Sequence, residues 1–168
     1  MVIEMKVAGI TLDPETKMPI VILIDLKGES ALPIWIGIAE ANAIATQLDK
    51  IDLARPMTHD LMRNLLSELG ARLERVVVTE LKENTFFSNL YLTVGDRSIS
   101  IDSRPSDAIA LALRVDSPIF VSEEVLQKAN RIDLKKADRE IGLSEDNRDK
   151  WAEILENLSP DAFGKYKM

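Results

Sequence analysis

Two acidic residues, Asp102 and Asp107, stand at the two ends of the polar segment DSRPSD. The segment follows a strand-like alternation and precedes the apolar run AIALAL, so a strand-to-helix loop could bring both carboxylates together. Such carboxylates bind divalent metals, and a bound metal can activate water for phosphodiester hydrolysis. In a second, purely structural interpretation, Ser103 or Ser106 caps the helix and the aspartates interact with its dipole.

Arg104 lies between these aspartates, at the N-terminal end of the predicted helix. The helix dipole disfavours a cation there, so a negatively charged group should compensate the guanidinium. That group could be Asp102 or Asp107 in a structural ion pair, or a phosphodiester, for which the planar guanidinium is well suited. Ser106 is a further candidate for contact with the same substrate.

A second polar cluster, RPMTHD from Arg55 to Asp60, also precedes a predicted helix. His59 and Asp60 fall in its first turn, where the dipole disfavours a charged imidazole and favours a neutral ring that can accept a proton. His59 is therefore a candidate general base, with Asp60 as a second candidate catalytic residue. Arg55 is a candidate phosphate ligand.

Three carboxylates form the expected metal site: Asp102, Asp107 and Glu40, which opens an earlier predicted helix. Mg²⁺ or Mn²⁺ is the expected ion, because a chain without cysteine and with one histidine offers mainly oxygen ligands. No organic cofactor is implied. The sequence has no HExxH, Walker, GxSxG or EF-hand pattern, so the prediction depends on residue types and not on a known catalytic motif.

The composition is that of a folded chain of one-domain size, with 168 residues, 46% hydrophobic and 29% charged. No apolar run reaches the roughly 18 residues of a membrane span, and the first residues lack a signal-peptide pattern. A cytoplasmic location without a membrane partner is therefore expected. The formal charge of −7 argues against a broad basic surface for DNA or RNA, and so counts against a nuclease.

Hydrophobic periodicity predicts an α+β fold, in which a mixed β-sheet packs with helices. A polar residue should cap two of the helices, Thr58 at one N-terminus and Ser122 at another, and Gly70 should end the first of these. A last helix is expected around Trp151. Strands are predicted over 3–12, 20–26, 32–36, 73–81, 86–94, 99–101 and 118–121, and helices over 40–51, 58–69, 108–113 and after 122.

An internal duplication is also predicted. A shift of 65 residues aligns Ile36 with Ile101 and the run 43–45 with 108–110, which indicates two related strand-strand-helix (ββα) units. The alternative is chance similarity between two alanine-rich amphipathic helices. A homodimer is expected, because a second copy could cover short edge strands and the apolar last helix.

Several strings resemble the bifunctional nuclease domain family: LPIWIG with EANAIA, RPMTHDL, IDSRPSDAIALALR and PIFV. The resemblance covers about residues 2–125 and implies a mixed α+β fold and hydrolysis of both DNA and RNA. It makes 1–130 a bifunctional-nuclease-like domain and 131–168 a C-terminal helical extension packed on it. The family's characteristic polar residues correspond to Glu40, Arg55, His59, Asp60, Asp102, Arg104, Ser106 and Asp107.

The sequence is compatible with two candidate functions. The first is a metal-assisted nuclease, in which the aspartates bind the metal and the arginines hold phosphate. The second is a non-enzymatic oligomeric binding or interaction module, in which the polar loops are structural. The acidic net charge and the lack of a known catalytic motif favour the second function.

Overall fold

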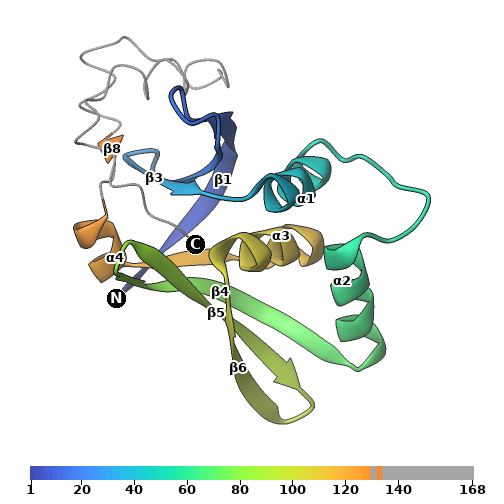
Figure 1. Ribbon diagram of the computed structural model, residues 1–168. Coiled ribbons are helices and arrows are strands. Elements are labelled where there is room, and N and C mark those ends of the chain that lie inside the picture. Colours follow the sequence, from blue (N-terminus) through green and yellow to red (C-terminus); the bar gives the residue numbers. More distant parts are fainter. Residues whose placement is uncertain (130–131, 134–168) are drawn as a thin grey trace.

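A computed structural model describes residues 1–129 and 132–133 of the chain. In this part, one eight-stranded sheet and four helices form the mixed α+β fold that the periodicity predicts (Figure 1). The helix expected around Trp151 lies outside the described residues, as does all but 132–133 of the expected extension 131–168.

The first half of the fold is an antiparallel meander followed by a helix. Its strands are β1 (Val2–Leu12), β2 (Pro19–Asp25) and β3 (Ser30–Trp35), and its helix is α1 (Ile38–Leu48). The turn after β1 is held by Asp13, which accepts hydrogen bonds from the Trp35 indole and from the amides of Glu15 and Thr16. Burial acts to raise the pKa of Asp13, but these hydrogen bonds outweigh it and lower the pKa.

The second half repeats this order after helix α2 (Thr58–Glu68). Strands β4 (Ala71–Lys82), β5 (Thr85–Val94) and β6 (Arg97–Ser103) form another antiparallel meander, and helix α3 (Pro105–Val115) follows. Each unit therefore has three strands, one more than the ββα unit expected from sequence. The duplication itself stays a prediction about origin.

Strand β7 (Ile119–Ser122) joins the two meanders, because it pairs in parallel with β4 and antiparallel with β1. Helix α4 (Glu123–Lys128) and the short strand β8 (Ile132–Asp133) complete the described fold. The sheet order is β6-β5-β4-β7-β1-β2-β3-β8. The strands next to each other in space are thus mostly neighbours in sequence, with β7 and β8 as the exceptions.

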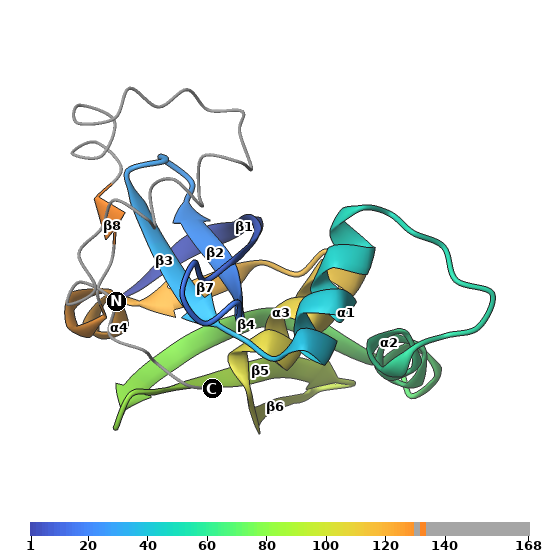
Figure 2. The same cartoon turned by 45° about the horizontal axis from the view of Figure 1, so that its top comes forward.

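Helix α3 is the centre of the molecule. Its run Ala108 to Ala112 is almost fully buried and packs in one core with strands of both meanders. Figure 2 shows α1 and α2 beside it, and α3 contacts both of these helices as well as β4 and β5. The apolar character of AIALAL on all sides is explained by this position.

The helix starts differ in part from expectation. Thr58 is the first residue of α2 and Met57 is the N-cap, so the predicted Thr58 cap is wrong. Neither Ser103 nor Ser106 caps α3: the N-cap is Arg104, whose extended backbone leads into Pro105. The predicted Ser122 cap is confirmed by a hydrogen bond from the Val125 amide. No helix among the described residues has the length and apolar character needed to cross a bilayer.

Candidate functional site

The candidate site lies where the first turns of α1, α2 and α3 approach one another. Each of these turns carries a carboxylate as its third residue: Glu40 in α1, Asp60 in α2 and Asp107 in α3. Carboxylates are favourable at this position because they interact with the positive end of the helix dipole. The packing of α1 and α2 against α3 then brings these acids to the arginines of α3.

His59 and Asp107 form the first link of the site. The His59 Nε2 atom lies 2.9 Å from Oδ1 of Asp107, and the imidazole is buried while the carboxylate is partly exposed. With Nε2 protonated, the ring donates to Asp107 and leaves Nδ1 as the unprotonated nitrogen. No hydrogen bond engages Nδ1 within the described residues. The pair therefore has the arrangement of a carboxylate-oriented general base.

Arg104 forms the second link. Its Nε atom donates to Oδ2 of Asp107 at 2.8 Å, and its Nη1 lies 2.9 Å from Oε1 of Glu40. The hydrogen bond with Asp107, and then the nearby charge of Glu40, raise the pKa of the guanidinium. The anionic compensation expected for Arg104 is thus supplied by one expected partner, Asp107, and by Glu40. The side chain is still 55% exposed, so it is accessible to a ligand.

Gly37 is what allows Glu40 to reach Arg104. The Glu40 carboxylate folds back over the start of α1, into the space that a Cβ atom at residue 37 would occupy. A glycine at this N-cap therefore has a steric function, because any larger residue would displace the flexible Glu40 side chain.

Asp60 lies on the same side of α3 but contacts a different residue. Its Oδ1 accepts from Nε of Arg114 at 2.7 Å, and its Oδ2 accepts from the Met57 amide at 2.9 Å. The Met57 hydrogen bond is the largest cause of the lowered Asp60 pKa; burial opposes it, and the hydrogen bond and charge of Arg114 add to the lowering. Asp60 is thus engaged in an ion pair with Arg114, which lies two turns of α3 beyond Asp107.

Arg114 is a residue that the sequence reasoning missed. Its guanidinium is almost fully buried and also donates to the carbonyl oxygens of Ala110 and Ala43, at 2.9 and 3.0 Å. It therefore ties α3 to α1 and, through Asp60, to α2. The signal was available in the sequence, because Arg114 follows Asp107 by seven residues and so lies on the same face of an otherwise apolar helix.

Three of the expected site residues lie elsewhere. Asp102 pairs across the sheet with Asn89, whereas its neighbour Ile101 pairs with the buried Leu90. Because successive strand residues point to opposite faces, Asp102 lies on the face away from α3, and the structure does not bring it to Asp107. Arg55 is exposed in the loop before α2 and forms no ion pair within residues 1–129.

Ser106 is the third of these residues. It is fully buried, and its hydroxyl has no hydrogen-bond partner in the described part of the chain. A substrate in solvent therefore does not reach it. It lies next to Asp107 in the first turn of α3, but it is not part of the accessible surface.

The expected metal ligands do not form a cation site in the described residues. Glu40 and Asp107 are both paired with the Arg104 guanidinium, and Asp102 faces away from them. Within residues 1–129, no three acidic or histidine side chains gather around one point. A divalent cation at the Glu40 and Asp107 carboxylates would have to displace an arginine that already neutralises them.

Comparison with known proteins identifies relatives of two kinds. Residues 21–133 match the family model described as the bifunctional nuclease domain. An uncharacterised protein of Mycobacterium tuberculosis (strain ATCC 25618 / H37Rv) is 40% identical over 162 residues, which are 95% of this chain and 97% of that protein. These two matches cover most of the described fold and all residues of the cluster.

Plant proteins match over a shorter part. Bifunctional nuclease 2 of Arabidopsis thaliana is 33% identical over 95 residues, and bifunctional nuclease 1 of Oryza sativa subsp. japonica is 30% identical over 97 residues. These segments are 55% and 56% of this chain but only 29% of either plant protein. The similarity to the named nucleases is thus confined to one portion of their length.

Proposed function

The chain belongs to the bifunctional nuclease domain family, and on that premise we propose that it hydrolyses phosphodiester bonds of DNA and RNA at the cluster of Glu40, His59, Arg104 and Asp107. The observation that supports this most directly is the hydrogen bond between His59 and Asp107, beside an exposed guanidinium. The plant relatives that carry the name bifunctional nuclease are consistent with this chemistry.

His59 acts as the general base in this proposal. Asp107 fixes the ring through Nε2, so Nδ1 takes a proton from a water molecule while the water oxygen attacks phosphorus. The bond from phosphorus to the leaving sugar oxygen breaks, and that oxygen takes up a proton from the imidazolium or from solvent. General-base assistance of this kind contributes about 10²- to 10⁴-fold to a rate.

Arg104 holds the phosphate. Two of its nitrogens are engaged by Asp107 and Glu40, which fix the orientation of the guanidinium. Its Nη2 has no hydrogen bond within the described residues, so it can donate to a non-bridging phosphate oxygen. Arg55, exposed in the loop that leads to His59, is the second proposed phosphate contact.

The dependence on Mg²⁺ or Mn²⁺ remains a proposal based on the sequence, and no step above requires the ion. The test is a nicking assay on supercoiled DNA and on single-stranded RNA, with the purified chain, in the presence and absence of chelator. His59→Gln should lower the rate about 10²-fold or more, and Arg104→Gln should raise the substrate concentration needed for half-maximal rate. Full activity of His59→Gln would overturn the assigned base.

A non-enzymatic interaction module is the second candidate function. It is favoured by one observation: the charges of Glu40, Asp60 and Asp107 are all compensated by arginines of the same chain. Under this alternative, the wild-type chain cleaves neither substrate at any metal concentration. The effect of Asp107→Asn is then confined to the unfolding midpoint.

A further inference from the structure

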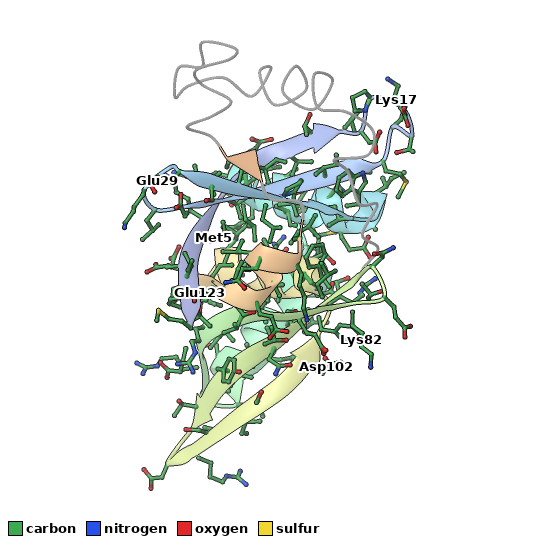
Figure 3. The ribbon with its side chains drawn as sticks, turned by 90° about the vertical axis from the view of Figure 1, so that its left-hand side faces the viewer. Met5, Lys17, Glu29, Lys82, Asp102 and Glu123 are labelled. Atoms are coloured by element: carbon green, nitrogen blue, oxygen red, sulfur yellow. The ribbon has the colours of Figure 1, made fainter. Side chains whose placement is uncertain are left out.

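Strand β6 forms one border of the sheet, and no strand of the described residues pairs with its outer side. Six of its seven residues are exposed, and its pairing with β5 runs from Arg97 to Ser103 without a bulge. Figure 3 shows Asp102 on this outermost strand. The strand contains neither proline nor lysine, which commonly protect such an edge, so it is a regular template for another strand.

The turn before β6 defines which of its main-chain groups are free. Gly95 and Asp96 form a two-residue turn, with Gly95 at φ 57°, so Val94 and Arg97 are the hydrogen-bonded closing pair. Hydrogen-bonded pairs alternate along an antiparallel ladder. The N–H and C=O groups of residues 98, 100 and 102 therefore point away from β5 towards the open edge.

We propose that a second copy of the chain pairs its own β6 with this edge, antiparallel and centred on Ser100, to form a homodimer with one continuous sheet. In this register Ser100 faces its counterpart, and Ser98 faces Asp102 of the other copy. These pairs use the main-chain groups that β5 leaves free. The register preserves the alternation of side chains between the two faces of the sheet, so the odd-numbered side chains of both copies lie on the face that α3 covers.

The side chains along β6 are complementary to themselves in this register. Ile99 and Ile101 are 37% and 47% exposed in one chain. In the dimer, Ile99 of each copy faces Ile101 of the other, so each side chain is covered by its counterpart on one side. Asp96 and Arg104 flank the paired segment, so residues of opposite charge lie at both ends of the two paired strands. No like charges face each other between residues 96 and 104. This self-complementarity favours a second copy over an unrelated strand.

The pairing also has a consequence for the candidate site. In this register the partner's hairpin turn lies near the end of β6, where Arg104 begins α3, so each copy forms part of the surroundings of the other's cluster. The proposal itself depends on the edge and its charges and not on catalysis. Its failure and the failure of the nuclease proposal are therefore separable.

Sedimentation velocity of the full chain over a range of concentrations tests the proposal. The molecular mass of the wild type should be twice the 18.8 kDa of one chain, whereas Ser100→Pro should have the mass of a monomer. Proline removes an N–H that points to the open edge, which an edge strand tolerates, so the monomer should keep its fold. Ser100→Thr, which keeps the N–H, is the matched control and should remain dimeric.

Asp96→Arg gives a second test that leaves the strand itself unchanged. It replaces two attractive contacts with Arg104 by two repulsive ones, and should weaken self-association about tenfold. Circular dichroism of each variant checks that the fold is intact. A monomeric wild type at all concentrations, or a folded Ser100→Pro that remains a dimer, would overturn the proposal.

Discussion

Removal of the Asp60 side chain should destabilise the protein strongly, because it leaves the Arg114 guanidinium buried without a counter-charge. The Arg114 side chain is 2% exposed, so water cannot replace the lost carboxylate. Its two remaining contacts are neutral carbonyl oxygens, those of Ala110 and Ala43. Breaking a buried ion pair by deleting one partner costs about 3–5 kcal/mol, and we expect Asp60→Ala to fall in this range.

Urea unfolding followed by circular dichroism at 25 °C measures this cost. A loss of about 3–5 kcal/mol corresponds to a decrease of roughly 6–20 °C in the thermal midpoint for a domain of this size. The lost hydrogen bond to the Met57 amide adds less to this cost than the buried charge does, because water can bind that amide at the exposed helix start.

The double variant Asp60→Ala with Arg114→Met separates the buried charge from the lost contacts. Methionine has a similar length without a charge, so the double variant should be more stable than Asp60→Ala alone. An exposed pair, Glu124 with Lys128, is the matched control, and Glu124→Gln should change the midpoint little. A cost below about 1 kcal/mol for Asp60→Ala, or a double variant no more stable than the single one, would show that the buried Arg114 charge is not what destabilises the protein.

Three further predictions concern stability at acidic pH, the space beside Gly37 and the backbone conformation of Gly70. The pKa values of Asp13 and Asp60 lie below their usual 3.8 in the folded state, so the unfolded chain binds more protons as pH falls. The stability that these two carboxylates contribute is complete above about pH 5 and is lost as pH falls through the folded pKa values. The urea midpoint of Asp13→Asn should therefore fall less steeply between pH 5 and pH 2 than the midpoint of the wild type. Gly37→Ala should displace Glu40 and lower any nuclease rate by up to about a hundredfold, with the unfolding midpoint almost unchanged, which rate and melting measurements check together. Gly70→Ala should cost about 1–2 kcal/mol in urea unfolding, because Gly70 has a φ of 64° and no nearby atom that a methyl group would contact favourably.

Most of the fold could be predicted from the sequence because its elements are strongly periodic and their ends carry turn residues. The β-branched runs of β2 and β4 and the all-apolar run of α3 correspond to the observed sheet and buried helix. The helix caps were less predictable. Extended backbone at Met57 and Arg104 begins two helices without a side-chain cap, so composition at these positions gave no signal.

The site was only partly predictable because it depends on how distant helices pack. Glu40 and Arg104 are 64 positions apart, and their ion pair exists only because α1 lies beside α3. The orientation of Asp102 could have been anticipated. Ile99 and Ile101 mark the inner face of β6, and Asp102 must then lie on the other face.

We propose that Asp107, and not Asp102, serves the reaction by orienting His59. The most direct measurement is the rate of DNA nicking by Asp107→Asn and Asp102→Asn, each compared with the wild type under identical metal conditions. We expect a loss of about 10²-fold or more in Asp107→Asn and a rate close to wild type in Asp102→Asn. Equal losses in both variants, or an active Asp107→Asn, would contradict this proposal.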